Sequence, residues 1–111
     1  LGRVATQGDE RVLSAVYARL RDDHADVRWA ALEALVLVAR RGDKRAISAA
    51  RGRLSDRDAD VREAAIDALL SLVEHGDRRG ITAVIERLDD ADVGVARKAK
   101  VALRRELWQL A

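Results

Sequence analysis

Residues 42–75 read GDKRAISAARGRLSDRDADVREAAIDALLSLVEH, and the 34 residues on either side follow the same pattern. Residues 8–41 match this stretch at 16 of 34 positions, and residues 76–109 match it at 13 of 34, both without a gap. The pair Gly-Asp opens all three stretches. Because a fixed period of this length is typical of proteins built from stacked structural units, the chain is predicted to contain three repeats.

Each repeat predicts two helices joined by a short acidic loop. In the first repeat, apolar residues three or four positions apart indicate a helix from about Glu10 to Leu20 and a second one starting near Val27. The acidic loops, which we expect to be solvated, span residues 22–26, 56–60 and 89–92. Gly42 and Gly76 are expected to stand where the second helix of the preceding repeat ends, and Asp43 and Asp77 to cap the helix that follows.

The composition favours helices and excludes several kinds of site. The 111 residues include 21 alanines and no proline, and alanine is the best helix former. The absence of cysteine excludes disulfides, thiolate metal sites and cysteine nucleophiles. His24 and His75 are too few for a histidine-rich metal centre, and neither has a partner at the spacing of a catalytic triad. We therefore predict no catalytic residue, no metal and no cofactor.

Two further features weaken other functional interpretations. The longest nearly apolar stretch, residues 29–39, is 11 residues long and contains Glu33, so no membrane partner is predicted. Asp56, Asp58 and Asp60 resemble the start of a calcium loop, but Val61 stands where that loop needs glycine. A solvated capping loop is the preferred interpretation of these aspartates.

One helix pair cannot bury its apolar face alone, so the pairs must stack into a single all-α domain. We expect repeats at residues 8–41, 42–75 and 76–111. Residues 1–7 align with the end of the second helix in the later repeats, and we interpret them as the remnant of a preceding unit. The chain is then expected to be part of a longer array.

The loop and the start of the second helix carry a family resemblance. Residues 20–28 read LRDDHADVR and residues 54–62 read LSDRDADVR, each followed by paired alanines and an Ala-Leu pair. These runs resemble HEAT repeats of the short, phycobilisome-lyase-like kind. The third repeat departs from the pattern, because Ala96 replaces the arginine. The resemblance implies a right-handed α-solenoid with a 34-residue period, and a role in binding proteins.

The resemblance also implies a role for four recurring residues. Arg28 and Arg62 follow Asp26 and Asp60 in the first two repeats. In HEAT-like arrays, Asp and Arg at such places form a ladder between neighbouring units, so we interpret all four as structural. Asp26 and Asp60 also suit the N-cap position of the second helix.

Binding residues are expected on the outward stripe of the second helices, which would line a concave docking face. Helical spacing predicts that this stripe holds Trp29, Glu33, Leu37, Arg40, Glu63, Asp67, Glu74, Arg97 and Arg105. Trp29 is the best single candidate for a partner contact. For the charged residues, the preferred interpretation is pairing between repeats, Glu63 with Arg97 and Glu74 with Arg105, and the alternative is that they orient a docked partner.

The last helix differs in charge from its counterparts. Lys98, Lys100, Arg104 and Glu106 stand where the second repeat has Ala64, Ile66, Leu70 and Leu72. The preferred interpretation is a C-terminal cap whose outer face meets water. The alternative is a basic strip that binds nucleic acid or an acidic partner, although no interleaved aromatic residues support it.

The sequence thus favours a non-catalytic scaffold that docks a protein or peptide on its concave helix layer. Two alternatives remain open: a nucleic-acid-binding module that uses the basic last helix, and part of a phycobilin-lyase-like protein. A DNA-glycosylase-like role would need Trp29 and the basic helix to converge, and they stand about two repeats apart.

Overall fold

The computed structural model of the protein describes residues 8–110, and all the regular secondary structure in that range is helical. The first repeat contains α1 (Glu10–Arg19) and α2 (Ala25–Val38). The second contains α3 (Lys44–Gly52), a 3₁₀ turn (Arg53–Ser55) and α4 (Ala59–Leu72). The third contains α5 (Arg78–Ile85), a 3₁₀ turn (Glu86–Asp89) and α6 (Val93–Leu110). The predicted all-α fold is confirmed; the expectation for residues 1–7 lies outside the described residues.

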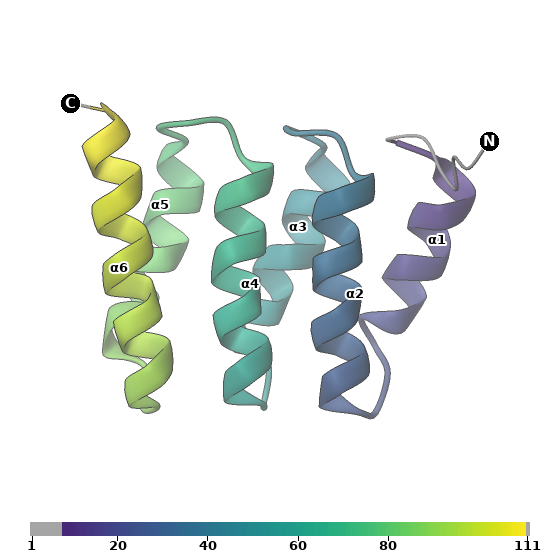
Figure 1. The fold of residues 1–111 in the computed structure, drawn as a ribbon, viewed down its shortest axis with the longest axis horizontal. Helices are drawn as coiled ribbons and strands as arrows, with labels where there is room; N and C mark the ends of the chain where they lie inside the picture. The colour runs from purple at the N-terminus through teal and green to yellow at the C-terminus, as the bar shows by residue number, and fades with distance from the viewer. Residues whose placement is uncertain (1–7, 111) are drawn as a thin grey trace.

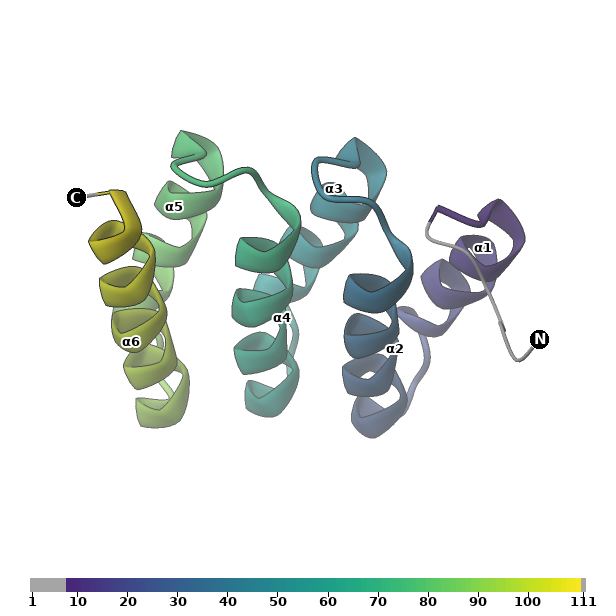
Figure 2. The ribbon, with the colours of Figure 1, turned by 45° about the horizontal axis from the view of Figure 1, so that its top comes forward.

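The helices form two layers. The second helix of each repeat, α2, α4 and α6, lies beside its counterparts in one layer, and α1, α3 and α5 form the other (Figure 1). The first helices stand further apart from one another than the second helices do (Figure 2). The layer of α2, α4 and α6 is therefore the inner side of a curved stack, and we call it the inner layer.

A single core runs between the layers. Leu35 on α2, Leu69 on α4 and Leu103 on α6 hold the same position in their repeats, and all three are buried. Alanines such as Ala46 and Ala65 are completely buried, and small side chains at a contact let helices approach closely. Each fully buried leucine stabilises the fold by roughly 1.5–3 kcal/mol. The abundance of alanine thus reflects close helix packing.

The linkers that begin each repeat have a common geometry. Gly8, Gly42 and Gly76 adopt φ angles of +85°, +86° and +80°, a region that favours glycine. The next residue in each case is an aspartate whose side chain accepts hydrogen bonds from backbone N–H groups of the following helix, as predicted for Asp43. The glycines do not end the preceding helices, however: α2 ends at Val38, well before Gly42.

Tertiary hydrogen bonds explain this position of the glycines. The N–H of Gly8 donates to the carbonyl of Val38, and the N–H of Gly42 donates to the carbonyl of Leu72, both at 2.6 Å. The linker is thereby fixed to the end of the second helix in its own repeat. In the third repeat, α6 continues past the equivalent residue, and the carboxylate of Glu106 accepts from the N–H of Gly76 at 3.3 Å instead.

The outer face of the third repeat is only partly polar. Lys100 and Arg104 are exposed, as expected for a cap. The expectation is wrong for Glu106, which is only 6% exposed because it lies over the linker at Gly76. Leu88 is 41% exposed, whereas its counterparts Leu20 and Leu54 in the two preceding repeats are buried.

Candidate functional site

A groove of about 560 Å³ lies between α2 and α4 on the inner layer. Its apolar lining comes from both helices and includes Leu32, Val36, Ala64 and Ala68. Trp29 and Leu37, which lie eight residues apart on α2, border it with 42% and 78% of their surface exposed. Each residue of an α-helix adds 1.5 Å along its axis, so the apolar part of the groove is about 12 Å long.

The rim of this groove is acidic. Glu33 on α2 and Asp60 and Glu63 on α4 line it, and they form no ion pair with any described residue. Asp67 is paired, because Lys98 of α6 donates to its carboxylate at 3.0 Å. Three carboxylates therefore face the groove without a cation.

The structure places five of the nine predicted stripe residues at this groove: Trp29, Glu33, Leu37, Glu63 and Asp67. Arg40 and Glu74 do not belong to the helical stripe, because α2 ends at Val38 and α4 at Leu72. Their side chains lie instead against the linker glycines, Arg40 beside Gly8 and Glu74 beside Gly42. The prediction that Arg40 and Glu74 belong to the stripe is therefore wrong, because both helices end earlier than the sequence pattern indicated.

Arg97 and Arg105 are exposed on α6, away from the α2–α4 groove. Arg105 borders a second hollow of about 390 Å³ between α4 and α6, which Arg41, His75 and Lys98 also line. The expected pairs Glu63–Arg97 and Glu74–Arg105 are not formed within residues 8–110. The pairing prediction is wrong, because the packing of α6 on α4 brings Lys98, rather than Arg97, to a carboxylate of α4, and that carboxylate belongs to Asp67.

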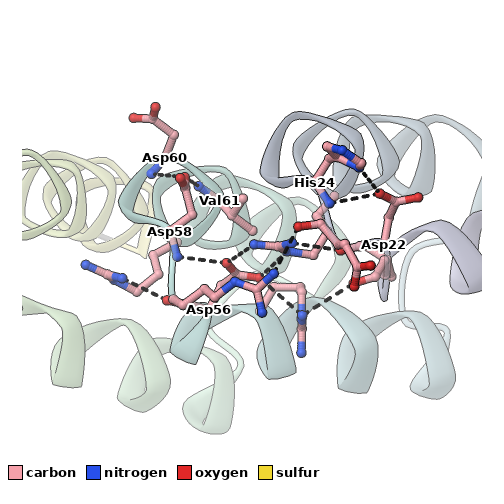
Figure 3. A network of polar contacts seen from close by, with 12 residues as sticks. Asp22, His24, Asp56, Asp58, Asp60 and Val61 are labelled. Atoms are coloured by element: carbon pink, nitrogen blue, oxygen red, sulfur yellow. Dashed lines mark hydrogen bonds and ion pairs between the residues drawn. The ribbon is translucent and has the colours of Figure 1, made fainter.

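A buried ion pair joins the first two repeats. The guanidinium of Arg28 donates to both carboxylate oxygens of Asp56, at 2.8 and 2.9 Å, and to the backbone carbonyl of Asp22 at 2.7 Å. Both side chains are almost completely buried. Arg53 also donates to Asp56, at 3.1 Å. The expectation of a solvated loop is therefore wrong for Asp56, which points into the junction (Figure 3), whereas Arg57 and Asp60 of the same loop are exposed.

The same arrangement recurs at the second junction. Arg62 donates to both oxygens of Asp90, at 3.0 and 3.1 Å, and to the carbonyl of Asp56 at 2.7 Å. Its side chain is more exposed than that of Arg28, 16% against 3%. We call the two pairs the ladder.

Burial raises the pKa of Asp56, but hydrogen bonds from Arg28 and from the N–H of Asp58, with the charges of Arg28 and Arg53, lower it more. The pKa of Asp56 therefore lies below its usual range. The pKa of Asp90 is lowered in the same way, with Arg62 and Arg87 as the cations. The ladder carboxylates are thus charged at neutral pH.

The acids of the ladder are Asp56 and Asp90, and not Asp26 and Asp60. Those two lie inside the first turns of α2 and α4, where a negative charge suits the helix dipole. They are not N-caps either: Asp58 caps α4 by accepting from the N–H groups of Asp60 and Val61 (Figure 3). His24 holds the N-cap position of α2 and makes no side-chain cap bond.

A sequence signal for the true ladder acids existed. Aspartate recurs at positions 22, 56 and 90, at the same place in each 34-residue repeat. The role of Lys98 on the inner layer was also missed, because its replacement of Ala64 suggested only a polar cap.

The described residues give no sign of other chemistry. No three His, Cys, Asp or Glu side chains among residues 8–110 are placed to hold a metal ion. In the described part of the chain, every helix is too short or too polar to cross a membrane.

A family model described as HEAT repeats matches residues 13–104, which is most of the chain. The chain belongs to the HEAT repeat family. No curated protein gives a significant match. HEAT repeats generally mediate protein–protein interactions and typically serve as non-enzymatic scaffolds. The α2–α4 groove, with its exposed Trp29, is the feature of this HEAT protein that best suits such a role.

Proposed function

We propose that this HEAT repeat protein is a non-catalytic scaffold that binds a protein or peptide on its inner layer. The observation that carries the proposal is the groove between α2 and α4, where Trp29 and Leu37 expose apolar surface within reach of unpaired charges. Protein interfaces commonly combine an apolar centre containing an aromatic residue with a polar rim.

The architecture that goes with this function is a right-handed solenoid with a 34-residue period, built from repeats at residues 8–41, 42–75 and 76–111. In support, the first helices begin at Glu10, Lys44 and Arg78, and the ladder residues recur at the same interval.

Site-specific photocrosslinking tests the binding surface. A photoreactive amino acid is placed at Glu33 or Val101, which are exposed on the inner layer, or at Ser14 or Ser48, which are exposed on α1 and α3. We expect one protein to be captured from the inner positions only. Capture of the same protein from α1 and α3, or capture from neither layer, would contradict the proposal.

A second candidate is nucleic-acid binding by α6, which exposes Arg97, Lys100, Arg104 and Arg105. These cations are a possible phosphate-binding surface, but their effect would be strongly reduced by salt. A mobility-shift assay with DNA at low and moderate salt distinguishes the two functions. Salt-sensitive binding that is lost in the Arg104→Glu variant would favour the second candidate.

A further inference from the structure

The α2–α4 groove has a chemical character that narrows the choice of partner. Its floor is apolar, and Trp29 and Leu37 stand at its two ends along α2. Leu37 is 78% exposed, so this large apolar side chain is largely uncovered by the described residues. Exposed apolar surface that is bordered by polar residues is typical of an interaction site.

The carboxylates of the rim give the groove a negative charge. Glu33, Asp60 and Glu63 face it unpaired, and Lys98, the one cation in the lining, is bound to Asp67. The protein as a whole carries a net charge of +2, so the charge of the groove is opposite in sign to that of the whole protein. Neighbouring carboxylates repel one another, and a cationic partner relieves that repulsion.

A third hollow, distinct from the one between α4 and α6, continues the negative surface beyond Trp29. It lies at the N-terminal ends of α2 and α4, has a volume of about 760 Å³ and shares Trp29 and Asp60 with the groove. Asp23, Asp26 and Asp58 also line it. The exposed indole of Trp29 is therefore bordered by carboxylates on both sides, which is a favourable setting for a cation over the aromatic face.

We propose that the groove binds a basic segment of a partner protein, with an apolar side chain lodged between Trp29 and Leu37 and Lys or Arg side chains over Glu33, Asp60 and Glu63. This inference rests on the proposed scaffold function and deepens it. The long stems of Lys and Arg cover apolar surface while their charges reach the rim. An acidic segment is disfavoured here, because it would place like charges opposite one another.

The hollow between α4 and α6 limits how far the basic segment can extend. Between α4 and α6 the lining includes Arg41, Lys98 and Arg105, so the surface becomes mixed in charge. The basic part of the partner is thereby confined to α2 and α4, and this change of charge sets the direction in which the segment lies.

Selection from a random library of 12-residue peptides against the whole chain tests the inference. We expect enrichment of peptides that combine net positive charge with at least one large apolar residue. Enrichment of neutral or acidic peptides, or no enrichment at all, would overturn the proposal.

Matched variants then locate the binding. For a selected peptide, the dissociation constant is measured by fluorescence anisotropy with the double variant Glu33→Lys, Glu63→Lys. The control is the double variant Glu86→Lys, Asp89→Lys, which makes the same charge change at exposed residues of the 3₁₀ turn after α5. We expect binding at least tenfold weaker in the groove variant and less than twofold weaker in the control. Equal weakening in both would contradict a groove site.

The apolar contact has its own variant. Leu37→Ser removes the apolar side chain without changing the charge of the groove or touching the core, because Leu37 is exposed, and we expect at least tenfold weaker peptide binding. Unchanged binding would remove the apolar anchor from the proposal. If peptide selection fails while photocrosslinking still captures a protein on the inner layer, the scaffold function stands and only the basic-segment inference falls.

Discussion

The guanidinium of Arg28 binds the carboxylate of Asp56, 28 residues further along the chain, through two hydrogen bonds of 2.8 and 2.9 Å. It is a bidentate, charge-assisted contact, which is the strongest kind of hydrogen-bonded pair. Since the two residues belong to successive repeats, the pair fixes the position of one unit on the next.

An aspartate recurs at the same place in each repeat, and replacing it with alanine should lower stability by a different amount in each of the three. Asp56→Ala leaves Arg28 buried without its partner, and we expect the free energy of unfolding to fall by about 3 kcal/mol. Asp90→Ala should cost less, because Arg62 is more exposed than Arg28. Asp22→Ala should cost least, because no described arginine of a preceding repeat binds it. Urea denaturation followed by circular dichroism measures the series, and equal losses at all three positions would refute the role of the arginines.

Stability should depend on pH through the same carboxylates. The pKa values of Asp56 and Asp90 are lower in the folded protein than in the unfolded chain, so the unfolded state binds protons first as the solution is acidified. We expect the free energy of unfolding to be steady at neutral pH and to fall as the pH drops through about 4. The fall should be shallower in Asp56→Asn. The control, Asp89→Asn, removes an exposed carboxylate of the 3₁₀ turn and should keep the wild-type slope.

Two glycines should respond to alanine in opposite directions. Gly42 has a φ of +86°, and a Cβ there would meet Glu74 Oε2 at 3.1 Å, so Gly42→Ala should destabilise the protein by about 1–2 kcal/mol. Gly52 lies at the end of α3 with open space where a Cβ would stand. Gly52→Ala should therefore stabilise by about 0.5 kcal/mol. Thermal melts of both variants give the signs, and a stabilising Gly42→Ala would show that the linker does not need its glycine.

The carboxylate of Glu106 should matter as a hydrogen-bond acceptor. It accepts from the N–H of Gly76 and lies 3.6 Å from His75 Nδ1. Glu106→Gln keeps an oxygen acceptor of the same length, whereas Glu106→Ala removes it. We expect the alanine variant to be less stable than the glutamine variant by about 1 kcal/mol in urea denaturation. Identical stabilities would mean that the linker of the third repeat needs no side-chain acceptor.

The helix pairs and their caps could be predicted from sequence because both depend on local patterns. Apolar residues at helical spacing place α1 and α2 within a few residues, and an aspartate after glycine predicts the cap at Asp43. The stripe that holds Trp29 and Glu33 follows from the same periodicity, whereas the exposure of Trp29 does not. Such features need no knowledge of the neighbouring repeat.

Features that depend on contacts between repeats were harder to predict. Asp56 looks like one more loop carboxylate until Arg28 is brought to it by stacking. Likewise, Glu74 continues the helical pattern of α4, but the helix ends at Leu72, whose carbonyl accepts from the N–H of Gly42. The choice of Lys98 as partner of Asp67 depends on how α6 lies against α4, which sequence spacing does not specify.

The two junctions between successive repeats differ in the hydrogen bonds that join them. At the first, Arg57 donates to the carbonyl of Asp23 and Arg41 to the carbonyl of Val73, in addition to the ladder pair. At the second, Ala91 stands where the repeat pattern placed Arg57, so the Arg57 bond has no equivalent, and the partly exposed ion pair of Lys98 with Asp67 is present instead. Under a stretching force applied along the stack, the third repeat should therefore detach before the first two separate, so the inner surface that holds Trp29 keeps its shape longest.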